Sequence, residues 1–410
     1  MPSPSSWRCD LANSEEQMPA NRSKDLEVLV GGDSKWKSLT AADDGDEAAK
    51  ASASVAGDAL RDHLGAIVNA ENLVVLSGSG TSIGVTAGAD QNVTAPSMSA
   101  LWNAVAALDT FEEATAGFTP SLLESKNFEH LLSEAQARSA LGLADVSLAE
   151  FIEAAERIVL EKCGFVDDES ALPEHETFLP KVARRSPRLQ RTQLFTTNYD
   201  LAFETAARRA RFNVIDGFGY GGTTFDGSSF DLDYVRRRPN EAPTLEPNVF
   251  HLLKLHGSVD WDQTAAVVRK TTGTPTTPVL IYPSASKYQL SYQQPYLEFM
   301  SRFQIALRQP DVGLIVVGFG FNDAHIVAPI EAALRSNIGM RAIVVSPNVN
   351  DPSRADSIAE MERLIGLGDR RLALLGGKFS DLVRLLPDVP PLEDQSAHLD
   401  RFERHERGAR

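Results

Sequence analysis

The chain has 410 residues, with 56 acidic against 40 basic side chains and a formal net charge of −16. This acidic balance disfavours a free-standing nucleic-acid binder, because the phosphate backbone is bound by Lys and Arg. The two cysteines, Cys9 and Cys163, are too few for a four-cysteine zinc ribbon or a disulfide scaffold, and they favour a reducing environment.

The first 54 residues differ in composition from the rest. They are rich in Ser, Asp, Glu, Ala and Lys, and few large apolar residues lie outside 26–30 and Trp36. Such a segment is hard to fold alone, so we expect an extension that is flexible or docks on a partner. No secretory signal begins the chain, and no apolar run approaches the ~18–20 residues that span a membrane. We therefore expect a cytoplasmic protein, with a charged tail at 391–410.

Between these ends, short apolar runs alternate with stretches of helical spacing. The apolar runs predict buried parallel strands at 72–77, 193–196, 250–255, 279–282, 312–317 and 342–346. Helices are expected at 201–211 and 323–336, and helical spacing also covers 99–162. This alternation predicts an α/β fold with a Rossmann-like, doubly wound parallel sheet. A helical insertion at about 99–185 would form a subdomain over one edge of a domain at 55–390.

Two of the predicted strands end in glycine-rich turns, and ligands of such sheets bind at the carboxyl ends of strands. The first strand runs into Gly78-Ser79-Gly80-Thr81-Ser82, and the strand at 312–317 runs into Gly318-Phe319-Gly320. Glycine lets the backbone approach a ligand, and amides at a helix start can face an anion. The alternative is a tight turn that requires glycine, since the third glycine of the dinucleotide spacing is missing.

Two other strand ends carry polar groups. They are Thr196-Thr197-Asn198-Tyr199-Asp200 and His256-Gly257. Asn and Asp are common helix caps, so capping is the alternative role of Asn198 or Asp200. A histidine at a strand end is placed like a base, although a single histidine is more often structural. The convergence of four such ends favours one shared site.

Together these segments resemble the sirtuin-like family of NAD-consuming proteins. The glycine loop is similar to the family's Gly-Ala-Gly-x-Ser, with Ser79 in the alanine position. Residues 196–200 look like its Thr-x-Asn-x-Asp element, and His256-Gly257 matches its catalytic His-Gly. Gly318-Phe319-Gly320 stands where the family has Gly-Thr-Ser. Order and relative position agree over about 55–390.

Longer strings resemble the bacterial antiphage-defence branch of this family, in particular the sirtuin-like subunit encoded beside a HerA-type ATPase. They lie at 195–204, 253–261, 281–288 and 317–326. This resemblance implies an NAD+ hydrolase that depletes the cellular cofactor during infection and arrests the cell. It also implies a ring-like homo-oligomer in complex with a hexameric HerA-type ATPase.

Two departures separate the chain from deacylating sirtuins. Those enzymes carry a four-cysteine zinc ribbon after the His-Gly, whereas 260–278 contains no cysteine. Their nicotinamide-binding loop carries Pro-Asp-Phe-Arg after the glycine motif, and 83–96 does not. We therefore expect no metal site, we disfavour protein deacylation, and we assign no residue to nicotinamide.

The resemblance implies a division of roles among the candidate residues. Asn198 would contact the nicotinamide-side ribose or the attacking water, His256 would be the general base, and Asp200 would orient the loop or the ribose. The remaining residues would bind NAD+: Gly78, Ser79 and Gly80, through their amides, with Thr81 and Ser82 at the pyrophosphate, and Gly318, Phe319, Gly320 and Ser346 or Pro347 at the adenosine half.

Other functions stay open at this point. The pocket could sense NAD or a related nucleotide within a defence complex without cleaving it, and a deacylase is the weaker alternative. Small basic clusters at 184–185 and 236–238 are typical of solvated faces. We therefore expect neither direct nucleic-acid binding nor membrane binding.

Overall fold

The computed structural model describes residues 26–39, 47–88, 90, 93–219, 223–264, 267–280 and 294–388. The first 25 residues, the tail at 391–410 and the 281–288 string therefore lie outside the described residues. Within the described part of the chain, every helix is too short or too polar to cross a membrane.

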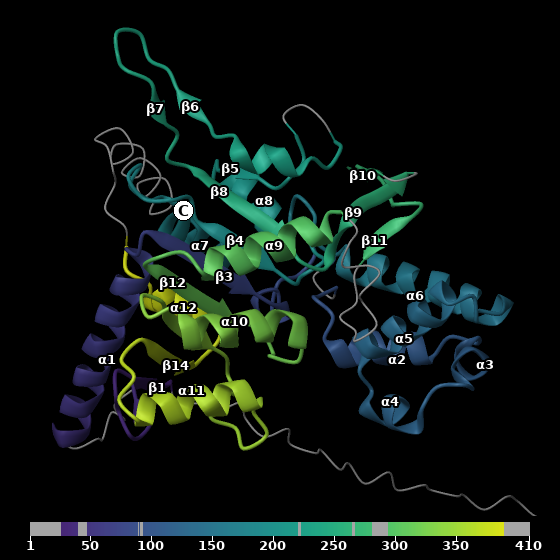
Figure 1. Ribbon diagram of the computed structural model, residues 1–410, viewed down its shortest axis with the longest axis horizontal. Coiled ribbons are helices and arrows are strands. Elements are labelled where there is room, and N and C mark those ends of the chain that lie inside the picture. Colours follow the sequence, from purple (N-terminus) through teal and green to yellow (C-terminus); the bar gives the residue numbers. More distant parts are fainter. Residues whose placement is uncertain are drawn as a thin grey trace, which may run out of the picture.

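A nine-stranded sheet runs through the centre of the molecule (Figure 1). Seven of its strands are mutually parallel, in the spatial order β14 (Leu372–Gly376), β13 (Arg341–Val345), β12 (Val312–Val317), β3 (Asn72–Ser77), β4 (Gln193–Thr196), β8 (Val249–Lys254) and β5 (Asn213–Ile215). From β3 the chain first adds strands on one side, towards β8, and later fills the other side from β12 to β14. The predicted α/β, doubly wound parallel sheet is therefore confirmed.

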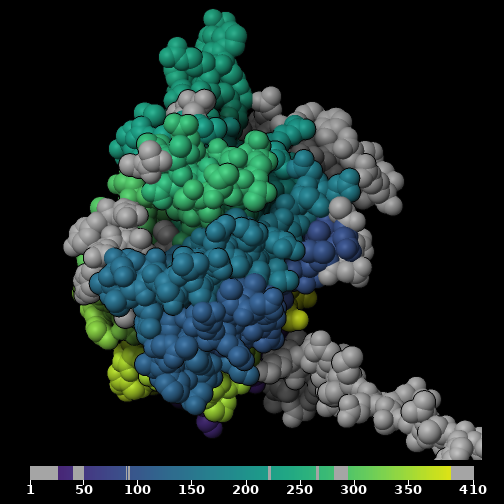
Figure 2. Space-filling view, turned by 90° about the vertical axis from the view of Figure 1, so that its right-hand side faces the viewer, coloured from purple at the N-terminus to yellow at the C-terminus, as the bar shows by residue number. Residues whose placement is uncertain are grey.

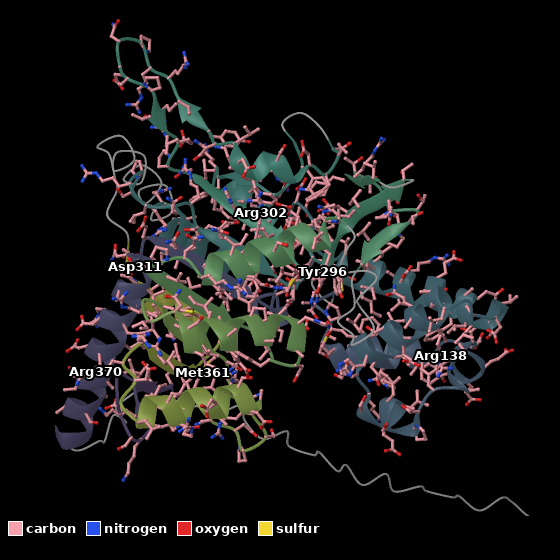
Figure 3. All side chains as sticks on the ribbon, in the orientation of Figure 1. Arg138, Tyr296, Arg302, Asp311, Met361 and Arg370 are labelled. Atoms are coloured by element: carbon pink, nitrogen blue, oxygen red, sulfur yellow. The ribbon has the colours of Figure 1, made fainter. Side chains whose placement is uncertain are left out.

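Helices cover both faces of this sheet, because alternate residues of each buried strand point to opposite sides. Val74 and Leu76 of β3 pack with α9 (Tyr296–Leu307), α10 (Ala324–Ser336) and α11 (Asp356–Gly366). Leu73 and Val75 pack with α1 (Glu47–Val68), α7 (Pro173–Ala183), α8 (Ala202–Arg209) and α12 (Phe379–Leu385). Tyr296 and Met361, labelled in Figure 3, belong to the first of these layers.

The N-terminal region departs from the expectation of a loose extension. Strand β1 (Glu27–Val30) pairs antiparallel with β14, and β2 (Lys37–Ser38) pairs with β1. Val28, Leu29 and Val30 are buried in the core of the sheet, and α1 runs through position 54. The predicted extension is wrong for residues 26–39 and its boundary at 54 is wrong, because the apolar run at 26–30 completes the sheet.

Five helices between β3 and β4 form a separate body beside the sheet, which faces the viewer in Figure 2. They are α2 (Met98–Ala106), α3 (Phe111–Thr115), α4 (Pro120–Ser125), α5 (Phe128–Ala140) and α6 (Val146–Cys163). Their side chains form one apolar cluster, with Phe128 and Phe151 fully buried. Helix α7 instead packs with α8 and α12 on the sheet, so this helical insertion ends at Cys163 rather than at 185.

Two smaller sheets follow in the second half of the chain. Strand β9 (Gly257–Thr264) begins directly after His256, between β10 (Val267–Lys270) and β11 (Pro278–Leu280). The described part of the strand predicted at 279–282 therefore belongs to this small sheet. Strands β6 (Val235–Arg236) and β7 (Thr244–Leu245) form a hairpin that projects at the top of Figure 1.

Candidate active site

The candidate site lies where adjacent parallel strands end. The strands β8, β4, β3, β12 and β13 are neighbours in that order, so their following loops share one edge of the sheet. The chain leaves β3 and β12 towards opposite sides, and the crevice between these two strands is therefore the topological switch point where ligands of such sheets bind. The four predicted segments thus meet at one place.

The glycines of the two glycine-rich loops pack directly against each other. A Cβ atom on Gly80 would lie 2.6 Å from the Cα atom of Gly318, and one on Gly78 would lie 2.6 Å from the Gly318 carbonyl oxygen. Gly318 also has a φ of +65°, which disfavours a side chain. The glycines are therefore required first by the crossing of two backbone segments.

The amides of the first glycine loop are occupied within the protein. The N–H groups of Gly78 and Gly80 donate to the carbonyls of Val317 and Gly318, at 3.1 and 2.9 Å. Those of Thr81 and Ser82 donate to Gly78 and Ser79 inside a three-residue 3-10 turn. Four of the five amides predicted at the pyrophosphate therefore already have acceptors within the protein.

Asn198 and Asp200 tie their loop to the glycine loop. The Asn198 side-chain amide donates to the hydroxyls of Thr81 and Ser82, at 3.1 and 2.9 Å. Ser82 donates to Asp200 Oδ2 at 2.7 Å, while Asp200 Oδ1 accepts the Ala202 N–H at 3.0 Å. All four polar side chains are buried. Asp200 thus anchors the start of α8 and holds Ser82 at the same time.

A buried lysine that was not predicted as a site residue also holds the loop that carries Asn198. Lys254 Nζ donates to the carbonyls of Tyr199 and Asp200 and forms an ion pair with Glu204 at 3.0 Å. Burial raises the pKa of Glu204, and the Lys254 charge opposes that shift. The loop that carries Asn198 is therefore held by β8 as well as by the glycine loop.

His256 is held between two acidic side chains. Its Nε2 lies 3.0 Å from Asp323 Oδ2, and its Nδ1 lies 3.8 Å from Glu129 Oε1. Asp323 is itself oriented as the N-cap of α10, because its Oδ1 accepts the His325 N–H at 2.9 Å. The following Gly257 is required where it stands, since a Cβ there would lie 2.0 Å from the Val279 carbonyl oxygen.

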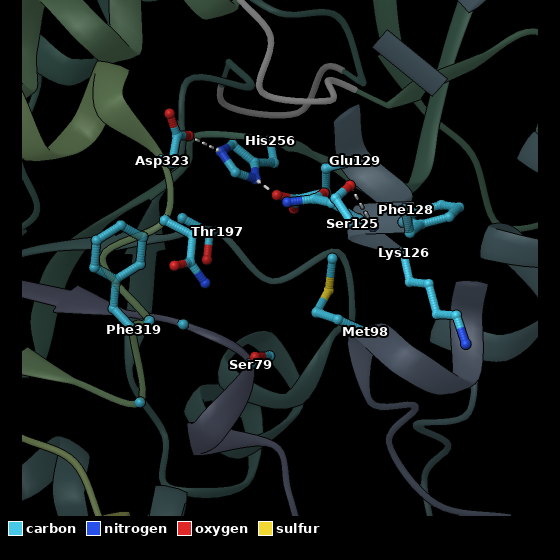
Figure 4. A pocket seen from close by; sticks show the side chains of 15 residues that line it. Ser79, Met98, Ser125, Lys126, Phe128, Glu129, Thr197, His256, Phe319 and Asp323 are labelled. Carbon is cyan, nitrogen blue, oxygen red and sulfur yellow. Dashed lines mark hydrogen bonds and ion pairs between the residues drawn. The ribbon is translucent and has the colours of Figure 1, made fainter. Parts of the chain in front are cut away.

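A cavity of about 250 Å³ opens in front of His256 (Figure 4). It is lined by six of the predicted residues: Gly78, Ser79, His256, Gly318, Phe319 and Gly320. Its other lining residues were not predicted: Met98, Ser125, Lys126, Asn127, Phe128, Glu129, Thr197, Asn322 and Asp323. Asn198, Asp200 and Ser82 are not among its lining residues.

A second cavity of about 330 Å³ lies on the other side of the Gly318 turn. Gly80, Thr81 and Gly318 line it, together with Pro347 after β13 and Lys378 after β14. Ser346 is not among its lining residues, and its hydroxyl accepts the Asn348 N–H at 3.4 Å. Of the two residues predicted at the end of β13, Pro347 is therefore the one placed at a cavity.

Sequence reasoning missed Asp323 and Glu129 for different reasons. Asp323 stands in the string 317–326, but an Asp before a helix has capping as its ordinary role, and it does cap α10. Glu129 comes from the helical insertion, in a segment without any recognisable motif. Within the part of the chain that the structure describes, no group of three or more His, Cys, Asp or Glu side chains could hold a metal ion.

Comparison with known proteins finds a family match. Residues 192–364 match the family described as SIR2-like domain, a range that includes Asn198, His256 and Gly318. Two ADP-ribose complexes of variants of a Sir2 homologue are similar solved structures, each with 15% sequence identity. Their TM-scores are 0.40 and 0.41; they cover 79% and 81% of this chain and 94% and 98% of their own. No curated protein matches the chain.

Proposed function

We propose that the protein is an NAD+ hydrolase that cleaves NAD+ to nicotinamide and ADP-ribose. The observation that carries this proposal is His256, a buried imidazole held by Asp323 in a cavity at the topological switch point. The SIR2-like match over 192–364 and the resemblance of the four strand-end segments to NAD-consuming proteins support the choice of substrate.

In the proposed reaction, the bond between the nicotinamide nitrogen and ribose C1′ breaks, and its electron pair leaves with nicotinamide. Water forms the new C1′–O bond and loses a proton, which His256 accepts. The Asp323 carboxylate, 3.0 Å from Nε2, stabilises the imidazolium that results. The products are nicotinamide, ADP-ribose and one proton, so the reaction balances without a further reactant.

Asn198 contacts the glycine loop through its side-chain amide. Its Oδ1 is buried and has no hydrogen-bond partner among the described residues, although its amide nitrogen is fully engaged. A buried acceptor without a partner is costly, and a water or a ribose hydroxyl would satisfy it. We assign Asn198 to that contact, and we assign Asp200 a positioning role through Ser82.

The two cavities suit the two halves of the dinucleotide. The nicotinamide-side ribose would occupy the cavity at His256, and the adenosine half the cavity that Pro347 lines. The pyrophosphate would then cross the Gly318 turn, which lines both. Four amides of the glycine loop have internal acceptors. The positive charge for the phosphates would therefore come from Lys126 and Lys378, which line the first and the second cavity.

We further propose that this activity serves antiphage defence by depleting cellular NAD+. The protein would act in the cytoplasm as a ring-like homo-oligomer in complex with a HerA-type ATPase. The support is the resemblance of the strings at 195–204, 253–261 and 317–326 to that branch. These strings contain Asn198, His256 and Asp323, so the resemblance is concentrated at the candidate site.

The test is to incubate the purified full-length chain with NAD+, alone and with a HerA-type ATPase, and to quantify nicotinamide and ADP-ribose. We expect equal amounts of the two products from the wild type and a loss of about 10²–10⁴-fold in Asn198→Ala. Thermal unfolding checks that the variant is folded, and the exposed His130→Ala is the matched control. Saturable NAD+ binding without products would support nucleotide sensing instead.

A further inference from the structure

The helical insertion supplies one wall of the cavity in front of His256. Residues 125–129, from the end of α4 to the first turn of α5, line that cavity, whereas the glycine loops line it from the sheet (Figure 4). Within this segment, Phe128 is fully buried in the apolar cluster of the insertion. Glu129, the next residue, faces the His256 ring (Figure 4), and its side chain is 19% exposed.

The two nitrogens of His256 differ in their surroundings. Nε2 lies 3.0 Å from Asp323 Oδ2, so this nitrogen is hydrogen-bonded within the protein. Nδ1 is buried without a hydrogen-bond partner among the described residues, and the nearest acidic oxygen, Glu129 Oε1, lies 3.8 Å away. This spacing is too long for a hydrogen bond but short for a charge interaction. Nδ1 is therefore the ring nitrogen on which the Glu129 charge can act.

Glu129 is held in this position from two directions. Asn127 caps α5 by accepting the His130 N–H at 3.0 Å, which fixes the first turn of the helix. Tyr199, from the loop that carries Asn198, is buried in the same apolar cluster as Phe128. The Tyr199 ring centroid also lies 6.3 Å from that of His256. The insertion is thus anchored on the loop that it faces.

We propose that Glu129 is a positioning residue for His256 and that the helical insertion thereby completes the catalytic site. This inference rests on the proposed NAD+ hydrolysis. When the His256 ring takes up the proton, the imidazolium lies between Asp323 and Glu129, and both carboxylates stabilise it. The Tyr199 ring also lies near His256, and Lys126 lines the same cavity.

The experiment compares Glu129→Gln and Glu129→Asp with the wild type, and uses Glu124→Gln as the control because Glu124 is an exposed acid on the neighbouring helix α4. NAD+ hydrolysis is measured from pH 5 to 9 in the full-length protein, with the ATPase if it is required. We expect Glu129→Gln to lower kcat about tenfold and to move the acid limb of the profile to lower pH. Glu129→Asp should lie between these values, and Glu124→Gln should match the wild type.

A second measurement does not depend on activity. Histidine rings labelled with ¹³C are titrated by NMR, with His256→Gln identifying the His256 signal, and we expect Glu129→Gln to move that titration to lower pH. An unchanged titration overturns the inference, as does an unchanged acid limb with kcat within twofold in an active enzyme. If the wild type does not cleave NAD+, a shifted titration still supports the pairing, and the proposed reaction alone is rejected.

Discussion

His175 and His256 are two buried histidines in opposite chemical surroundings. His175 on α7 is 0% exposed, and its ring packs edge-on against Phe203 and Phe379, with centroids 4.8 and 5.1 Å away. Neither of its ring nitrogens has a hydrogen-bond partner among the described residues. His256 is 3% exposed, but a carboxylate faces each of its two nitrogens.

The two histidines therefore differ in the charged groups around the ring rather than in burial. Burial lowers the pKa of His175 to about 4, although the Asp200 charge opposes the shift. The ring then stays neutral and behaves as one more aromatic side chain of the core. At His256, two carboxylates lie beside the ring, 3.0 and 3.8 Å from its nitrogens. Burial alone therefore does not distinguish a core histidine from a candidate catalytic one in this protein. The polar groups around the buried ring do.

The largest expected difference between the two histidines is in activity. We expect His256→Gln to lower NAD+ hydrolysis by about 10²–10⁴-fold, because glutamine cannot take up the proton in the transition state. His175→Phe should stay within twofold, since its ring contacts only the core. Initial rates with NAD+, together with circular dichroism spectra, check both variants. Equal losses in the two variants would remove the distinction.

The pH dependence of stability should come from His175. Its ring stays neutral in the folded protein down to about pH 4, whereas in the unfolded chain it takes up a proton below about pH 6.5. The unfolded state then binds more protons, so the free energy of unfolding falls by about 3 kcal/mol as the pH drops through this window. His175→Phe should remove that part of the slope, measured by urea unfolding at pH 7, 5.5 and 4.5.

A third histidine, the half-buried His251, serves as the internal reference for this measurement. Burial also lowers the pKa of His251 to about 4, and His251 is present in both proteins. The wild type and His175→Phe should therefore both lose stability in acid, and only their difference reports on His175. Parallel curves for the two proteins would show that His175 is protonated in the folded state.

Strands were predictable wherever a long apolar run ends at a glycine. Every residue of β3 and β12 is buried, and both strands lie where such runs predicted them. Strand β14 was missed because its Leu-Ala-Leu-Leu sequence also suits a helix. Strand β1 was missed because a short apolar run stands in a polar segment, and only its pairing with β14 makes it a strand.

The candidate site was predictable only where its residues directly follow strands. Asn198, His256 and Gly318 stand at such ends, so their meeting follows from the sheet. Glu129 reaches His256 through the packing of the insertion, which leaves no local pattern. The Gly78 and Gly80 amides of the glycine loop are occupied because they contact residues 317–318, which are distant in the chain. The sequence shows which residues a loop contains, but not which of its backbone amides remain free to bind a ligand.

The charge of Asp323 can be removed without removing the helix cap. Asparagine caps helices as well as aspartate, so Asp323→Asn should keep the hydrogen bond from the His325 N–H. A charge-assisted hydrogen bond exceeds a neutral one by about 1–2 kcal/mol, so we expect NAD+ hydrolysis to fall about tenfold. Asp145→Asn, at the N-cap of α6, is the matched control. Equal rates in Asp323→Asn and the wild type would show that Asp323 acts only as a cap.

The smallest effect is expected from His175 at neutral pH, where the ring carries no charge. Its two nitrogens are buried without partners, and each unsatisfied group lowers the stability of the fold. Phenylalanine keeps the edge-on contacts with Phe203 and Phe379 and carries no polar atom, but its slightly larger ring costs some packing energy. We therefore expect His175→Phe to raise the free energy of unfolding at pH 7 by about 1 kcal/mol. A destabilised variant with intact NAD+ hydrolysis would show that the His175 nitrogens have polar partners in solution, and the two buried histidines would then differ less than their surroundings indicate.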